Sequence, residues 1–249
     1  HVAFDEVCRA AEARGMRVTG SELVGLVPLA ALLDAGRHYL RKQQRSLGVS
    51  EAELVRIAIA SLGLDELAPF DPAERVIEYR LRDTGAGRLV GMTVRAFADE
   101  TASESAAPGG GSVAALVGAF AASLGTMVAN LSAHKRGWDE RWEEFSGWAE
   151  RGQRIKGELL RLVDADTLAF DRVMAALAMP KATDAEKAAR AAALETANRG
   201  ALEVPWQVMQ VVAGTFDLLE AMALQGNPAS ASDAGVGALC ARAAIRGAW

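Results

Sequence analysis

The sequence contains few of the residue types that bind metals or form disulfides. Among its 249 residues are two cysteines, Cys8 and Cys240, and three histidines, His1, His38 and His134. The cysteines lie far apart, which fits a reducing, cytoplasmic compartment better than a disulfide-stabilised scaffold. The histidines are scattered and match no metal-ligand spacing. We therefore expect a protein without a disulfide framework and without a metal site.

The chain also lacks the positive charge that nucleic-acid-binding proteins carry. Its formal net charge is −5, and its lysines and arginines form no basic stripe. Both observations argue against a nucleic acid as the main partner. We expect no signal peptide, and the chain starts at His1 rather than at a methionine. From that start we expect a fragment or a processed form of a protein.

One uncharged run, from Ser105 to Ala133, is longer than the roughly 20 residues that a membrane span requires. Small residues recur along it at helical spacing, among them Gly118, Ala122 and Thr126. Such residues let neighbouring backbones pack closely, in a membrane bundle as well as in a soluble core. No second span, aromatic belt or basic flank accompanies the run. We expect a central helix in the core of a soluble protein, and no membrane partner.

The first 90 residues carry a mixture of helix and strand patterns. Apolar residues at helical spacing predict helices over residues 4–14, 29–40 and 54–62. Residues 16–20 and 76–81 have the β-branched or alternating character of strands. A glycine-rich stretch between residues 83 and 91 is the best domain boundary, and every later segment has a helical pattern. We therefore predict a mainly α protein, in which a helical bundle follows a small, incomplete α/β segment.

Several breaks divide the helical part of the chain. Pro180 ends one helical pattern, and the capping box at residues 183–186 predicts the start of the next. Pro205 predicts a kink or a fresh helix start. Asn227-Pro228 predicts a helix end, and residues 230–233 supply candidate caps for the last helix, with Asp233 among them.

A glycine-rich segment, Gly109, Gly110, Gly111 and Ser112, stands near the start of the uncharged run. Glycines let a ligand approach the main chain, and the first turn of a helix adds unpaired N–H donors and a positive dipole end. The segment therefore predicts a cradle for an anion or a polar ligand. A flexible turn with Ser112 as the N-cap explains the same residues equally well. The segment is neither a Walker loop nor a dinucleotide fingerprint, because no Gly-Lys-Ser/Thr follows it and no strand-like segment precedes it.

Asp166 is out of place on its helix. It lies on the face of residues 159–177 that is otherwise apolar, where a carboxylate is costly unless it is paired or useful. It is therefore either a site residue or a structural partner, which holds an arginine such as Arg190 or caps another helix. The neighbouring Asp164 falls about 160° away around the helix, which indicates a solvated side chain.

Asp233 and Lys181 are further candidates, each with a simpler explanation. Asp233 stands at a helix start, where an N-cap is the simpler role, although a carboxylate there can also face a pocket. Lys181 follows Met179-Pro180 in a tight break between helices, which fixes the stem of its side chain. The simpler role for Lys181 is that of a solvated surface lysine.

Taken together, these residues resemble the formimidoyltransferase-cyclodeaminase family of bifunctional folate enzymes. Ser21–Pro28 and Leu32–Ala35 are similar to the end of its transferase domain, and residues 62–79 are similar to its connector. The similarity to its cyclodeaminase domain lies in Ser105–Ala115, Leu162–Asp166, Ala169-Phe170, Met179-Pro180-Lys181, Glu186-Lys187, Val204-Pro205, Gly226-Asn227 and Ser232-Asp233.

The resemblance implies a domain division and an assembly. Residues 1–44 correspond to the end of the transferase domain, residues 45–90 to the connector, and residues 91–249 to the helical cyclodeaminase domain. The family's catalytic transferase histidine belongs to a portion with no counterpart here, so we expect no transferase activity. The family also implies a homodimer or a higher homo-oligomer that acts in the cytoplasm, in histidine degradation.

The resemblance also implies a reaction. The family's cyclodeaminase closes 5-formimidoyltetrahydrofolate to 5,10-methenyltetrahydrofolate and releases ammonia, with the tetrahydrofolate derivative as substrate and no covalently bound cofactor. The chemistry needs a base for the N10 proton, an acid for the departing nitrogen and negative charge near a cationic amidine. We expect Asp166 and Asp233 to be the two catalytic carboxylates. We expect Gly109–Ser112 to bind the folate, and Lys181 to attract its glutamate carboxylate.

Two other functions fit the same residues. A methenyltetrahydrofolate cyclohydrolase can use the same helical fold and the same folate loop, and only the transferase-like segment favours the cyclodeaminase. A non-catalytic helical assembly module is the alternative outside the enzymes. The inward position expected for Asp166 argues against that module.

Overall fold

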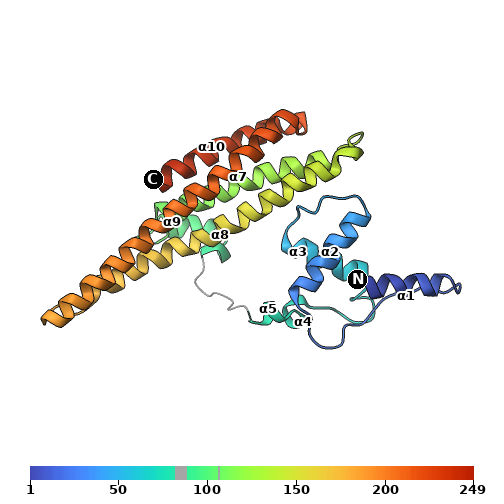
Figure 1. Cartoon of the computed structure of the whole chain (residues 1–249), viewed down its shortest axis with the longest axis horizontal. Coiled ribbons are helices and arrows are strands. Elements are labelled where there is room, and N and C mark those ends of the chain that lie inside the picture. The colour runs from blue at the N-terminus through green and yellow to red at the C-terminus, as the bar shows by residue number, and fades with distance from the viewer. Residues whose placement is uncertain (82–88, 106) are drawn as a thin grey trace. The chain divides into compact units, whose positions relative to one another are not determined.

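The computed structural model describes residues 1–81, 89–105 and 107–249 (Figure 1), and its regular structure within these ranges is helical. In this part of the chain the one β-type pairing is an isolated parallel bridge between Val27 and Val76. The prediction of a mainly α protein is confirmed. The strands predicted over residues 16–20 and 76–81 are wrong, since the first segment is irregular and α5 (Ile77–Leu81) occupies most of the second. A short β-branched run forms a strand only where a partner strand lies beside it.

The chain divides into two compact units. The first unit comprises His1–Ala86 with Ala133–Gly147, and the second comprises Gly87–Ser132 with Trp148–Trp249. The boundary predicted between residues 83 and 91 falls largely outside the described residues, which resume at Leu89.

The first unit contains five short helices around a small core. Their bounds are α1 (Val2–Glu12), α2 (Leu29–Lys42), α3 (Glu51–Leu62), α4 (Pro72–Arg75) and α5, and the short η2 (Asp139–Arg141) also belongs here. The backbones of α2 and α3 approach closely, because a Cβ atom on Gly36 would lie only 2.3 Å from the carbonyl oxygen of Leu54. Ser50 caps α3 by accepting the N–H of Glu53 at 3.2 Å. The helices predicted over residues 29–40 and 54–62 are thus confirmed as α2 and α3.

The second unit is a helical bundle whose long helices carry the candidate site. Its elements are η1 (Leu89–Gly91), α6 (Val94–Thr101), α7 (Gly110–Ala133), α8 (Trp142–Ala178), α9 (Asp184–Gln225), η3 (Pro228–Ser230) and α10 (Ala231–Ala248). In Figure 1, α8 and α9 run side by side and extend beyond α7 and α10. The groove between the extended parts is lined by residues of both helices, mostly alanines.

Small residues on α7 bring its neighbours close. A Cβ atom on Gly118 would lie 2.7 Å from a methyl group of Val212, and one on Gly125 would lie 2.8 Å from Leu218, both on α9. α7 is long and apolar enough to cross a membrane by composition alone, but 61% of its most apolar stretch is buried inside the protein. The prediction of a closely packed core helix is confirmed.

The helix boundaries follow most of the predicted breaks. Thr183 and Glu186 form a capping box at the start of α9, and α9 ends at Gln225 before Asn227-Pro228. Pro205 starts no new helix, because α9 continues through it from Asp184 to Gln225. The adjoining Val208 is buried in the core, and this packing offsets the backbone hydrogen bond that a proline removes.

Candidate functional site

The glycine segment forms the first turn of α7. The helix begins at Gly110, and the N–H of Val113 donates to the carbonyl of Gly109 at 3.1 Å. Ser112 lies inside the helix and is fully buried, so the interpretation of Ser112 as the N-cap is wrong. The first N–H groups of such a helix have no partner within it, and they give this end a partial positive charge.

Asp166 of α8 lies directly against this turn. The hydroxyl of Ser112 donates to Oδ2 of Asp166 at 2.9 Å and lies 3.3 Å from the hydroxyl of Thr167. A Cβ atom on Gly111 would lie 2.2 Å from Oδ1 of Asp166. The carboxylate therefore occupies the space that any side chain at position 111 would need. The buried Ser112 hydroxyl holds it there.

Asp166 also lines a cavity of about 320 Å³, as its place on the apolar face predicts. The other lining residues are Ala107, Gly109, Gly110, Gly111, Thr167, Ala169, Phe170 and Ala201. We call this the Asp166 cavity. The alternative partner Arg190 is engaged elsewhere, because its Nε donates to the carbonyl of Leu177 at 3.3 Å.

The position of Asp166 changes the ligand that this end of α7 suits. A carboxylate already supplies negative charge beside the helix N-terminus, where the dipole stabilises it. A second anion in the same cavity would be repelled by Asp166. The Asp166 cavity therefore suits a cationic or hydrogen-bond-donating group, with apolar contacts from Ala169 and Phe170. Of the two ligand classes expected for the glycine turn, an anion or a polar ligand, the position of Asp166 favours the polar, hydrogen-bond-donating one.

Asp164 has a structural role. Its Oδ1 accepts the N–H of Leu89 at 2.8 Å and that of Val90 at 3.4 Å, so it anchors the short η1 element to α8. The side chain is half-buried rather than solvated. The interpretation of Asp164 as a solvated residue is therefore wrong.

Asp233 is not near Asp166 within one chain. Ser230 is the N-cap of α10, and Asp233 lies in the first turn, so the N-cap interpretation of Asp233 is wrong. One turn later, a Cβ atom on Gly237 would lie 3.5 Å from Leu124 of α7. At about 1.5 Å per residue, α7 rises roughly 20 Å between Gly111 and Leu124. Gly247 of α10 lies near Ala114, so α10 runs antiparallel to α7, and Asp233, one turn before Gly237, lies still farther from the turn that holds Asp166.

Lys181 is exposed in the connection between α8 and α9. From Asp166 to the end of α8 at Ala178, the helix rises roughly 18 Å. Lys181 therefore does not join the Asp166 cavity of its own chain. The structure groups Asp166 with Gly109, Gly110, Gly111 and Ser112, and it leaves Asp233 and Lys181 apart.

Thr167 is a site residue that the sequence pattern did not indicate. It lines the Asp166 cavity, and its hydroxyl lies next to that of Ser112. A threonine beside an aspartate on a helix carries no signal of its own. Only the approach of α7 to α8 gives it a polar partner.

Comparison with known proteins identifies the family of both units. Residues 93–249 match the family described as formiminotransferase-cyclodeaminase, and residues 1–82 match the formiminotransferase domain. The formimidoyltransferase-cyclodeaminase of Sus scrofa is 39% identical over the whole chain, which spans 46% of that relative. The relative from Dictyostelium discoideum is 34% identical and is covered to 45%. The chain thus spans about half the length of these curated relatives.

Two other similar proteins each match a little under two thirds of the chain. A methenyltetrahydrofolate cyclohydrolase of Methylorubrum extorquens is 40% identical over 156 residues, which are 63% of this chain and 75% of that protein. The crystal structure of a formiminotetrahydrofolate cyclodeaminase from Thermotoga maritima has a TM-score of 0.55 and 30% identity, and it covers 64% of this chain and 75% of its own. The resemblance seen in the sequence motifs is confirmed: the chain belongs to the formiminotransferase-cyclodeaminase family.

Proposed function

We propose that this chain closes 5-formimidoyltetrahydrofolate to 5,10-methenyltetrahydrofolate and releases ammonia, in the Asp166 cavity. The observation that carries the proposal is the carboxylate of Asp166, which Ser112 holds against the open first turn of α7 at 2.9 Å. This arrangement presents fixed negative charge to a small cavity. A fixed charge of this kind binds a cationic group, and it speeds a reaction to the extent that it stabilises the transition state more than the substrate.

Both the protonated substrate and the product of this reaction carry a positive charge. In the protonated substrate, the formimidoyl group is an amidinium. N10 attacks its carbon, a new C–N bond forms, and the C–N bond to the terminal nitrogen breaks. The N10 proton passes to that nitrogen, which leaves as ammonia, and the positive charge remains on the methenyl bridge. Asp166 is suited to receive the N10 proton and return it to the leaving nitrogen.

A second candidate is the hydrolysis of methenyltetrahydrofolate, because the relative from Methylorubrum extorquens is named a methenyltetrahydrofolate cyclohydrolase and is 40% identical over 156 residues. That reaction adds water to the same cationic methenyl carbon, so one carboxylate serves either chemistry. The match of residues 1–82 to the formiminotransferase domain favours the cyclodeaminase. A formimidoyl transferase produces the substrate that a cyclodeaminase consumes.

The roles expected for Asp233 and Lys181 at the Asp166 cavity require a second copy of the chain. We infer that the protein is a cytoplasmic homodimer or higher homo-oligomer of histidine degradation, in which Asp233 and Lys181 reach the Asp166 cavity of another subunit. Support comes from the exposed apolar side chains of α7, namely Phe120, Met127 and Leu131, which an interface would cover. The molar mass of the purified chain, measured by light scattering, tests the assembly.

The two enzymatic candidates differ in the preferred substrate. We expect kcat/KM for 5-formimidoyltetrahydrofolate to exceed that for methenyltetrahydrofolate hydrolysis by at least about tenfold, which corresponds to about 1.4 kcal/mol of transition-state stabilisation. Steady-state kinetics with both compounds and one enzyme preparation measure the ratio. A preference for the methenyl compound would instead establish the cyclohydrolase.

A further inference from the structure

The first unit contains a polar cavity that the proposed reaction does not use. Its volume is about 260 Å³, and we call it the Arg45 cavity. It is formed by α3, by the end of α2 with the following loop, and by His134 beyond the end of α7. Its lining residues are Leu40, Gln43, Arg45, Ser46, Val49, Glu53, Arg56, Ile57, Ala60, Ser61 and His134.

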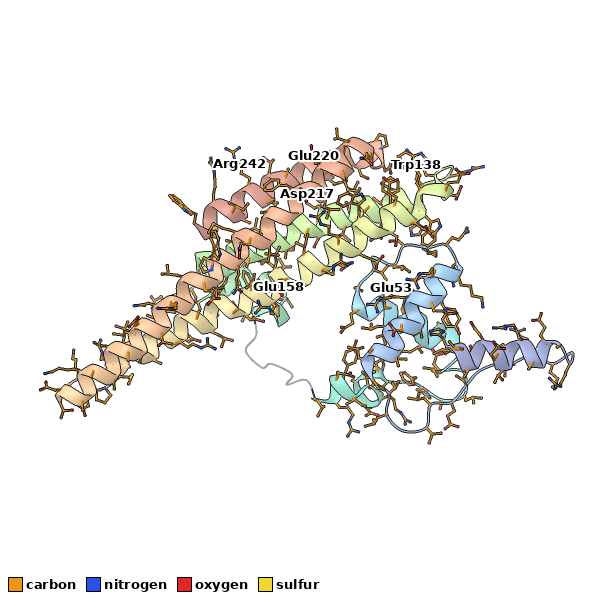
Figure 2. The ribbon with its side chains drawn as sticks, in the orientation of Figure 1. Glu53, Trp138, Glu158, Asp217, Glu220 and Arg242 are labelled. Atoms are coloured by element: carbon orange, nitrogen blue, oxygen red, sulfur yellow. The ribbon has the colours of Figure 1, made fainter. Side chains whose placement is uncertain are left out.

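The charges around the Arg45 cavity do not cancel. Glu53 of α3, labelled in Figure 2, pairs with Arg56 through two hydrogen bonds of 2.7 and 2.5 Å. Hydrogen bonding from Arg56 is the main reason why the pKa of Glu53 is low, and the charge of Arg45 contributes more weakly. Glu53 is the one carboxylate among the lining residues, and Arg56 engages it. Arg45 forms no ion pair with any described residue, and its charge acts on Glu53 only weakly, because Arg56 already engages that carboxylate.

His134 lines the same cavity as Arg45 and is affected by its positive charge. Burial first, and the charge of Arg45 second, lower the pKa of His134. The next cation along the chain, Lys135, is directed elsewhere, since its ammonium lies 4.0 Å from the ring centroid of Trp138. Arg45 and His134 therefore lie close enough to repel each other when both are protonated.

We propose that the Arg45 cavity binds a small oxyanion, a carboxylate or a phosphate group, between Arg45 and His134. The planar guanidinium donates two parallel hydrogen bonds to such a group, and a protonated imidazole adds a further charged donor. The side chains of Gln43 and Ser61 can donate from the same lining. The anion supplies the ion-pair partner that Arg45 lacks among the described residues. This site is independent of the function proposed for the Asp166 cavity.

The binding should be visible as a change at His134. A bound anion favours the charged imidazole, so it should raise the pKa of His134. Binding should accordingly strengthen as the pH falls through that pKa. The whole chain has only three histidines, so His134 can be followed by NMR, with His134→Gln identifying its resonance.

The experiment titrates the intact chain with sodium phosphate, and separately with sodium acetate, at constant ionic strength held with chloride. We expect a saturable shift of the His134 resonance with at least one oxyanion. The oxyanion that binds more tightly, phosphate or acetate, identifies the class of ligand. Arg45→Gln should weaken this binding by about tenfold or more, as expected for the loss of a charge-assisted hydrogen bond. Arg37→Gln is the matched control, because Arg37 is paired with Asp34 and lies outside the cavity.

Two outcomes would overturn the proposal. One is a His134 resonance that neither oxyanion shifts saturably in the unmodified chain, a test that needs no variant. The other is equal binding by the unmodified chain and Arg45→Gln. If Arg45→Gln is poorly folded by circular dichroism, Arg45→Lys replaces it. That variant retains the charge without the two-pronged donor geometry, so it should bind more weakly than the unmodified chain.

Discussion

Asp166→Asn should lower kcat for ammonia release from 5-formimidoyltetrahydrofolate by roughly 10²- to 10⁴-fold. The amide keeps the shape of the side chain and can still accept the hydroxyl of Ser112. It cannot take up the N10 proton, and it brings no negative charge to the cationic substrate. Steady-state kinetics measure the loss, and circular dichroism with thermal unfolding shows whether the bundle is intact.

The control for this variant lies on the same helix. Asp171→Asn also removes one carboxylate from α8, but the Asp171 side chain is exposed and does not line the Asp166 cavity. We expect it to leave kcat nearly unchanged. A purely structural role for Asp166 predicts the opposite result for Asp166→Asn, with a lower melting temperature and full turnover, and that result would refute the catalytic assignment.

Gly111→Ala should lower kcat/KM by roughly 10²-fold, because displacing a catalytic group by about 1 Å can cost that much. The new methyl group would lie 2.2 Å from Oδ1 of Asp166, so the carboxylate must move away from the start of α7. Alanine favours a helix more than glycine does, so a general loss of helix structure is not expected. Kinetics with the formimidoyl substrate measure the effect.

The adjoining glycine provides a matched control. A Cβ atom on Gly110 meets nothing within 4 Å, although it belongs to the same helical turn. Gly110 also lines the Asp166 cavity, so Gly110→Ala changes the cavity wall without displacing the Asp166 carboxylate, and we expect a clearly smaller loss of kcat/KM than for Gly111→Ala. Equal losses in the two variants would show that the turn needs glycine for another reason, and the contact between Gly111 and Asp166 would then not explain the effect.

The helices of the second unit could largely be predicted from local signals. The capping box at Thr183 and the uncharged run of α7 each determine structure through nearby residues. The strand predicted at residues 76–81 failed because a strand depends on a distant partner, and Val76 meets only Val27. Of the two alternatives predicted at Pro205, the fresh helix start is wrong, because α9 is continuous through it, and the kink stays a prediction.

The candidate site could be predicted in part. Asp166 breaks the apolar pattern of its helix, and that local anomaly correctly placed it in a cavity. Its contact with Ser112 could not be predicted, because a helical pattern does not say which turn of one helix meets which turn of another. The same uncertainty affected Asp233, which belongs to another motif of the resemblance, Ser232-Asp233, and lies on a different part of the bundle.

The most direct test of the central claim is the stoichiometry of the reaction itself. Purified chain is given 5-formimidoyltetrahydrofolate, and ammonia and 5,10-methenyltetrahydrofolate are measured in the same samples over time. We predict that both products appear in equal amounts, above the uncatalysed rate, and that Asp166→Asn slows both to the same extent. No ammonia above the uncatalysed rate, with steady hydrolysis of added methenyltetrahydrofolate by the same preparation, would contradict the account.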